Sequence, residues 1–223
     1  GAPGVDGVTF WEIERTGVAT FLVDIAESLQ ARRYTPLPIR RVMIPKPDGR
    51  ERPLGIASIR DRVVQAACKI VMEPIFEPHL HRLSFGYRPQ KRAQEAIREI
   101  EAEIKTGYIH VYDADLSGYF DSIPHRPMMK KLARRISDKQ FLALIRKMLK
   151  APVQTTDSNG KRHYSASTVG VPQGNVLSPL MANVYLNDFC LTIANRTPCK
   201  IVTYADDFAI LHKERYTREQ LDW

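Results

Sequence analysis

Several features are scarce or missing in this chain of 223 residues. It has three cysteines, Cys68, Cys190 and Cys199, an odd number without the paired spacing of a metal site, so we expect reduced thiols that serve in packing. No stretch approaches the roughly 20 apolar residues that span a membrane, and the N-terminus lacks the charged and apolar regions of a signal peptide. Flexible linkers, low-complexity tracts and internal repeats are also missing. We therefore expect a soluble protein with no membrane partner, built as one large domain or two closely packed ones.

The ends of the sequence suggest a larger context. The chain starts at Gly1 without a methionine and stops at Trp223, shortly after the helix-like start Thr217-Arg-Glu-Gln220. We therefore expect a piece of a longer protein, with its function only partly present.

Positive charge is in excess, with 33 Lys and Arg against 25 Asp and Glu and a formal net charge of +8. Such a balance makes a polyanionic partner plausible. Many of the basic runs are expected to be solvated faces. Others alternate with glycine, proline and aromatic residues, as in Phe85–Pro89, which better suits a groove for phosphates and bases.

Hydrophobic periodicity predicts helices and antiparallel hairpins in alternation. Helices are expected over residues 18–32, 63–74, 89–105, 125–136, 138–150 and 176–193. Strands are expected over residues 39–44, 50–56, 108–115, 153–156 and 163–166 and in the hairpin 200–212. Asp48-Gly49 between the first two strands is typical of a tight turn. The pattern predicts an α+β fold, with helices packed around one small antiparallel sheet.

Two of the predicted strands end in acid. Asp206 and Asp207 lie in the turn of the last hairpin, and Asp115 ends the strand that starts at Tyr108. An Asp-Asp pair alone is ordinary turn chemistry. A third carboxylate favours a cation, because like charges side by side repel unless solvent or a cation balances them. Asp113 lies on the same strand face as Asp115, so both stay open as ligands, and Asp121 is a third option.

A cluster of this composition suits magnesium, which prefers few carboxylates and keeps positions open for substrate oxygens. Asp115, Asp206 and Asp207 can hold two Mg²⁺ ions roughly 3.5–4 Å apart, and the main-chain carbonyl of Leu116 can add a ligand. At that spacing one ion activates an attacking hydroxyl while the other stabilises the leaving phosphate.

Six blocks of the sequence resemble, in the same order, those of group II intron maturase reverse transcriptases. They are Gly4–Gly7, Ile44–Ile56, Ser84–Pro89, Ala114–His125, Gly170–Asn183 and Tyr204–Asp207. The last three are similar to the three catalytic motifs of reverse transcriptases in general. The resemblance covers nearly the whole chain.

The resemblance implies the fingers and palm of a right-hand polymerase without a thumb. Residues 1–107 would be mainly fingers and residues 108–223 mainly palm, with some interleaving. It makes Asp115, rather than Asp113, the metal ligand of the first motif, with Asp206 and Asp207 as the others. Two Mg²⁺ ions are the implied cofactor, with Mn²⁺ as a substitute.

The resemblance also implies a binding site for the deoxynucleoside triphosphate. Lys46 and Arg52 match the cations that grip the triphosphate, and a guanidinium offers the bidentate geometry that phosphates prefer. Phe120 matches the ring that crowds the sugar 2′ carbon and excludes ribonucleotides, although it would otherwise read as a core residue. Gln173 and Gly174 match the loop beneath the nascent base pair, where glycine permits close approach.

Four further arginines are expected to meet RNA: Arg41, Arg50, Arg62 and Arg88. The implied partners are an RNA template, intron RNA, a DNA or RNA primer and deoxynucleoside triphosphates, with a homodimer as a further expectation. The implied location is the bacterial cytoplasm or an organelle, in a reducing compartment. The isolated fragment is expected to hold template weakly and to be weak or inactive.

Three other functions compete with this one. The chain could serve chiefly as an RNA-binding splicing cofactor, or belong to a retron, a diversity-generating element or a CRISPR-associated system. An RNA-dependent RNA polymerase is disfavoured by Phe120, since such an enzyme needs space for the ribose hydroxyl.

Overall fold

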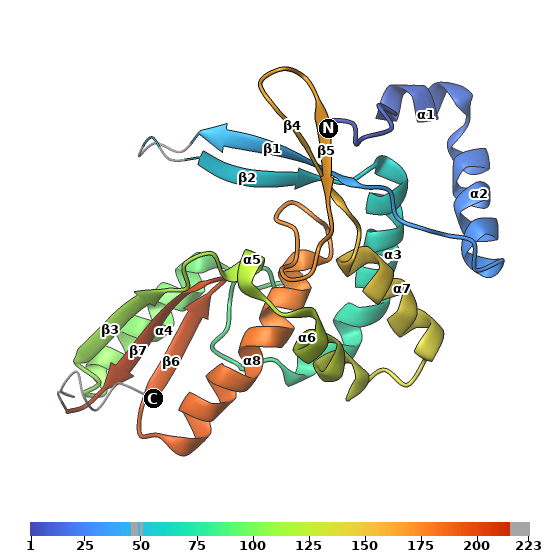
Figure 1. Ribbon diagram of the computed structural model, residues 1–223. Coiled ribbons are helices and arrows are strands. Elements are labelled where there is room, and N and C mark those ends of the chain that lie inside the picture. The colour runs from blue at the N-terminus through green and yellow to red at the C-terminus, as the bar shows by residue number, and fades with distance from the viewer. Residues whose placement is uncertain (46–48, 50, 215–223) are drawn as a thin grey trace. The chain divides into compact units, whose positions relative to one another are not determined.

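The computed structural model of the protein describes residues 1–45, 49 and 51–214 (Figure 1). It consists of two compact units, each assembled from two stretches of chain. The first unit contains Gly1–Pro74 and Phe120–Ser178, and the second contains Ile75–Tyr119 and Pro179–Trp223. The assignment of fingers and palm to residues 1–107 and 108–223 stays a prediction.

The first unit holds most of the helices. Its elements are α1 (Phe10–Thr16), α2 (Val18–Gln30), β1 (Ile39–Pro45), β2 (Glu51–Ile56), α3 (Ile59–Phe76), α6 (His125–Ala133), α7 (Lys139–Leu149), β4 (Val153–Thr156) and β5 (Arg162–Ser165), with α3 reaching just past its boundary. The short helix α5 (Tyr119–Ser122) spans the boundary between the units. None of the described helices is long and apolar enough to cross a membrane.

The first unit is organised around a four-stranded sheet in the order β2-β1-β4-β5. Each predicted hairpin forms as expected, but β1 also pairs with β4 in parallel, Ile39 opposite Val153. The expectation of one small sheet is therefore wrong, because the described residues form two. A parallel contact between distant hairpins leaves no local pattern in the sequence.

The second unit contains η1 (Glu77–His79), α4 (Ala93–Lys105), β3 (His110–Asp115), most of α8 (Ser178–Arg196), β6 (Lys200–Tyr204) and β7 (Asp207–His212). Its sheet is antiparallel, in the order β3-β7-β6. This is the small antiparallel sheet packed by helices that the sequence predicts, and the α+β class is confirmed.

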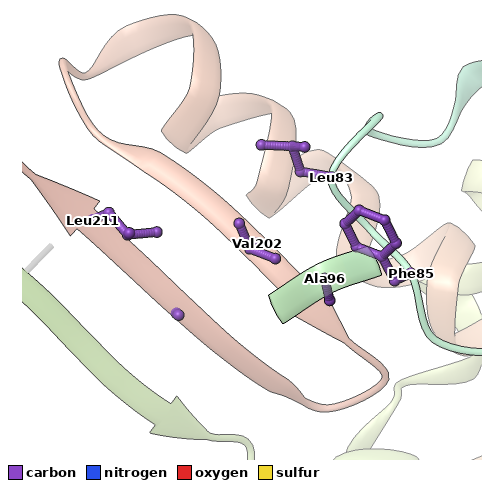
Figure 2. Close-up of a cluster of buried hydrophobic side chains, with 6 residues drawn as sticks. Leu83, Phe85, Ala96, Val202 and Leu211 are labelled. Atoms are coloured by element: carbon purple, nitrogen blue, oxygen red, sulfur yellow. The ribbon is translucent and has the colours of Figure 1, made fainter. Parts of the chain in front are cut away.

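The core of the second unit explains why this sheet is rigid. Leu83, Phe85, Ala96, Val202 and Leu211 form one buried cluster, which Figure 2 shows at the face of the β6–β7 hairpin that α4 covers. Because side chains alternate across a strand, Phe208 points to the other face, where its ring packs edge-on against Phe189 of α8 with centroids 5.5 Å apart. Helices on both faces fix the hairpin that ends in Asp206 and Asp207.

The cysteines are packing residues, as predicted. Cys68, Cys190 and Cys199 are buried and free. Burial raises the pKa of the Cys68 and Cys190 thiols to about 11, so both are neutral and unreactive near neutral pH.

Candidate active site

Three carboxylates adjoin at one end of the sheet of the second unit. Asp115 is the last residue of β3 and lies directly opposite Asp207, the first residue of β7. Asp206 precedes it in a two-residue turn with Ala205, and its carbonyl accepts a hydrogen bond from the Leu116 N–H at 3.3 Å. The predicted convergence of two acidic strand ends is therefore present in the fold. We call Asp115, Asp206 and Asp207 the acidic cluster.

The members of the acidic cluster lie within electrostatic reach of one another. Partial burial, followed by the negative charges of Asp206, Asp115 and Asp113, raises the pKa of the Asp207 carboxyl. Among residues 1–45, 49 and 51–214, no group of three His, Cys, Asp or Glu side chains is arranged to hold a metal ion as it stands. The donor set nevertheless fits a divalent cation, because it consists of adjoining hard oxygens whose mutual repulsion a cation would relieve.

The Leu116 carbonyl, the fourth predicted ligand, lies in the turn that follows β3. It accepts a hydrogen bond from the Tyr119 N–H at 3.1 Å, and the Tyr119 hydroxyl donates to the carbonyl of Ala182 at 2.7 Å. A carbonyl oxygen has two lone pairs, so one remains for a cation.

Of the two alternatives to Asp115, Asp113 lies two residues back on the same strand, opposite Ala209. It therefore adds to the negative field without lying at the strand end. Asp121 belongs to the first unit, where its carboxylate accepts a hydrogen bond from the Gln173 amide at 3.2 Å.

A segment without a predicted role supports the acidic turn. Leu83 and Phe85 exchange backbone hydrogen bonds with Thr203 of β6, at 2.9 and 2.8 Å. Gly86 then lies against the turn so closely that a Cβ atom there would come within 2.8 Å of Ala205 Cα. Ala205 has a φ of 61°, a region that non-glycine residues rarely adopt, so the turn is held in a strained conformation.

Asn183 completes this support. Its buried side-chain amide donates to the Gly86 carbonyl at 2.8 Å, linking the segment to α8. Gly86 and Asn183 both lie in the sequence blocks that carry the resemblance, but nothing in the pattern showed that they meet. The signal was a glycine between two aromatic residues, which marks a close approach as readily as a turn.

Arg88 is a correction to the predicted RNA contacts. Its side chain is only 7% exposed and forms an ion pair with Glu77 at 2.7 Å. The remaining N–H groups donate to the Glu77 carboxylate and to the carbonyls of Glu77, His81 and Ser84. All five donors of the guanidinium are thus used inside the second unit, and Arg88 holds the chain around Ser84 instead of RNA.

The first unit contains a second polar constellation. The Arg52 Nε–H donates to the Gln173 side-chain oxygen at 2.9 Å, and the Gln173 amide donates onward to Asp121. The Gly55 N–H also donates to the Gln173 carbonyl at 2.7 Å. Arg52 and Gln173, predicted separately as nucleotide contacts, are therefore in direct contact, with Arg52 exposed on β2.

The loop that carries Gln173 is pinned on both sides. Gly174, with a φ of +99°, lies so near Gly55 that a Cβ would be 2.6 Å from its carbonyl oxygen, so a side chain cannot replace this glycine without displacing β2. On the other side, the Val171 N–H donates to the Phe120 carbonyl at 2.7 Å. The Phe120 side chain itself is buried, at 7% exposure.

The other predicted arginines differ in what they touch. Arg41 is exposed on β1. Arg62 donates to the carbonyls of Ala57 and Ala2 and lies over the Phe10 ring, so much of its guanidinium is used within the fold. Lys46 and Arg50 lie outside the described residues.

Comparison with known proteins gives a consistent result. The model of the family described as reverse transcriptase (RNA-dependent DNA polymerase) matches residues 44–221. Protein YkfC of Escherichia coli (strain K12) is 42% identical over 84% of this chain and 49% of YkfC. The group II intron-encoded protein LtrA of Lactococcus lactis subsp. cremoris is 37% identical over 74% of this chain and 26% of LtrA.

A solved structure adds the fold. A chain of a partial Cas6-RT-Cas1–Cas2 complex is 25% identical with a TM-score of 0.53, covering 89% of this chain and 34% of that one. The chain therefore spans about half of YkfC, 49%, and smaller shares of the other two proteins, 26% and 34%.

Proposed function

Because this chain belongs to the reverse transcriptase (RNA-dependent DNA polymerase) family, we propose that it carries the nucleotidyl-transfer site of an RNA-directed DNA polymerase. The observation that supports this most directly is the acidic cluster, with Asp115 opposite Asp207 and beside the turn of Asp206. The reaction would join a primer 3′ hydroxyl to the α-phosphate of a deoxynucleoside triphosphate, with RNA as the template.

Reverse transcriptases generally use divalent metal ions. We assign Mg²⁺, with Mn²⁺ as a substitute, to the acidic cluster and the Leu116 carbonyl. Bound there, two such ions would activate the attacking hydroxyl and stabilise the leaving phosphate. The protein's own part is to hold three carboxylates at fixed strand ends, so that their positions do not depend on a mobile loop.

The nucleotide contacts belong to the first unit. Exposed Arg52 would bind the triphosphate, and its bond to Gln173 would orient the guanidinium toward it. Gln173 and Gly174 would lie beneath the nascent base pair, and Phe120 would crowd the sugar 2′ carbon. Lys46 would add a second cation to the triphosphate.

The similarity to LtrA and to intron-encoded proteins of fungi favours a group II intron protein that supports intron mobility and splicing. Its partners would be template and intron RNA, with Arg41, Arg50 and Arg62 among the contacts, and a DNA or RNA primer. A homodimer stays a prediction, for which sedimentation analysis is the test. The CRISPR-associated alternative has less support, because the similarity to the Cas6-RT-Cas1 chain is 25% against 37% for LtrA.

The test is primer extension on an RNA template by the protein that carries residues 1–223. Asp206→Asn should reduce synthesis by at least about 100-fold, since even indirect support of a metal ligand is worth about 10–100-fold. Asp24→Asn, at an exposed position on α2, is the matched control and should copy normally. Undiminished synthesis by Asp206→Asn would remove the acidic cluster from the reaction.

Two further measurements separate the parts of this proposal. Manganese binding, followed by electron paramagnetic resonance without nucleotide, should weaken in Asp206→Asn and not in Asp24→Asn. Phe120→Ala should admit ribonucleotides, and unchanged sugar discrimination would leave Phe120 a core residue only. If splicing assistance survives in Asp206→Asn while copying is lost, the same chain also acts as a splicing cofactor.

A further inference from the structure

A groove of about 810 Å³ lies between α6, α7 and the segment Ala166–Thr168 of the first unit (Figure 1). This volume is within the roughly 300–1,000 Å³ that is typical of ligand sites. None of the residues assigned above to metal, nucleotide or template lines it. We call it the α6–α7 groove.

The α6–α7 groove is rimmed by four exposed cations: Arg126 and Lys130 on α6, and Arg146 and Lys150 on and just after α7. Each pair is spaced four residues apart, so both of its members lie on one helix face. Within the described part of the chain, none of the four forms an ion pair, and no acidic residue lines the groove. Like charges at this spacing repel, so the arrangement favours an anion that bridges them.

The wall of the groove contains a polar group that lacks a partner. His125 is 9% exposed, and its Nε2 is 2.7 Å from the Gly170 carbonyl. Its other ring nitrogen, Nδ1, is buried without a hydrogen-bond partner among the described residues. Buried polar atoms are normally paired, so a polar ligand is one way to complete this wall. Ser167 and Thr168 add hydroxyl donors to the same lining.

The floor of the groove is apolar. Met129, Ala133 and Leu142 lie between the cations of the two helices. Cations at the rim over an apolar floor suit a ligand with regularly spaced negative charges and less polar parts between them, as in a nucleic-acid strand. A small inorganic anion would leave most of this surface uncovered.

We propose that the α6–α7 groove binds the phosphodiester backbone of an RNA strand, with Arg126, Lys130, Arg146 and Lys150 contacting phosphates. The identity of the strand rests on the proposed reverse transcriptase function, since DNA offers the same phosphates. The groove is a second RNA contact, separate in its residues from the acidic cluster and from the Arg52–Gln173 pair. His125 couples it through Gly170 to the loop that carries Gln173.

The test compares two variants from which the same number of charges is removed. The groove variant is R126Q/K130Q/R146Q/K150Q, and the control is R33Q/K105Q/R135Q/K139Q, whose four positions are exposed and outside the groove. Binding of a fluorescein-labelled oligouridine of about 20 nucleotides is measured by anisotropy at several salt concentrations. Equal net charge in the two variants isolates the effect of position.

The groove variant should bind more weakly, and its log–log salt slope should shrink by about 0.7 for each phosphate that it no longer binds, up to roughly 2.8. At about 0.1 M salt this corresponds to about a fivefold weaker affinity per phosphate. The control should keep the wild-type slope. A groove variant with the wild-type slope and affinity would overturn the proposal.

Two further arms keep the result decisive. Millimolar inorganic phosphate should not displace the oligouridine from wild-type protein, and displacement would assign the groove to free phosphate instead of a strand. If the groove variant does not fold, wild-type protein is crosslinked to 4-thiouridine RNA and the adducts are mapped. Adducts should fall within residues 125–150 or 166–168, and their absence there would equally refute the proposal.

Failure here and failure of the polymerase assignment are distinguishable. Asp206→Asn should bind the oligouridine like wild type while losing synthesis. Copying that depends on Asp206, together with RNA binding that ignores the groove, would refute the groove alone.

Discussion

Gly86→Ala tests whether the acidic cluster depends on the segment packed against its turn. The added Cβ would lie 2.8 Å from Ala205 Cα, 2.9 Å from the Tyr204 carbonyl carbon and closer still to the Ala205 nitrogen. All three are backbone atoms, so no side-chain rotation can relieve the clash. Ordinary contact begins near 3.4 Å. The turn must therefore move by at least about 0.6 Å.

Two effects of different size should follow from this displacement. Overpacking typically costs about 1–3 kcal/mol, which for a chain of this length lowers Tm by roughly 2–12 °C. A misplacement of about 1 Å at reacting groups can cost about 100-fold in rate, so we expect kcat to fall by about 10–100-fold. KM for the nucleotide should change little, because the residues proposed to bind it belong to the first unit.

The assay is single-nucleotide incorporation on an RNA template, with thermal unfolding followed by circular dichroism. Gly107→Ala is the control, because Gly107 has a φ of +98° and open space around it, and it precedes β3 at the end opposite Asp115. Its left-handed backbone makes alanine cost roughly 1–2 kcal/mol without touching the turn. If Gly86→Ala melts and incorporates like wild type, or loses rate only as Gly107→Ala does, Gly86 has no special role at the turn.

Three other predictions follow from the second and first units. Arg88→Met should lower the free energy of unfolding by roughly 2–4 kcal/mol in urea, because Glu77 and buried carbonyls lose their donors, whereas Arg82→Gln, at an exposed ion pair 3.9 Å long, should cost less than about 1 kcal/mol. Burial, then the charges of Arg82 and Arg88, lower the pKa of His81, so the unfolded chain binds more protons; stability should be full above about pH 6.5 and decline as the pH falls toward the lowered value. His81→Gln should flatten that decline in a series of Tm measurements, and an unchanged slope would contradict the assignment. Arg52→Gln should raise the nucleotide KM about tenfold or more with a smaller change in kcat, since a charged hydrogen bond is worth about 1.5–3 kcal/mol, and an unchanged KM would remove Arg52 from the triphosphate site.

Local patterns in the sequence predicted the elements well where the pattern was strong. The hairpins of β1–β2 and β6–β7 and the long helix α8 follow from alternation, turn residues and helical spacing. Helix α1 was missed although its capping box is readable, with the Thr9 hydroxyl and the Glu12 carboxylate bonded to each other's backbone N–H. Seven residues are too few for a periodicity to stand out.

Long-range contacts were out of reach of the sequence. The meeting of Asp115 and Asp207 could be expected because acidic residues end two strands, and strand ends in one sheet tend to meet. Arg88 was misassigned because its surroundings resemble those of an exposed RNA-binding arginine, and only the fold shows that Glu77 and three carbonyls enclose it. The contact of Gly86 with the turn likewise depends on chain segments that no local pattern relates.

The discontinuous make-up of the second unit has a consequence for synthesis on the ribosome. Strand β3 pairs only with β7 in its sheet, and β7 starts at Asp207, after the whole second stretch of the first unit. The first unit can therefore complete its pairing while β3 still has an open edge, which is a site for wrong pairing. The acidic cluster cannot exist until that edge is closed, so the last step of folding is also the step that creates the chemistry.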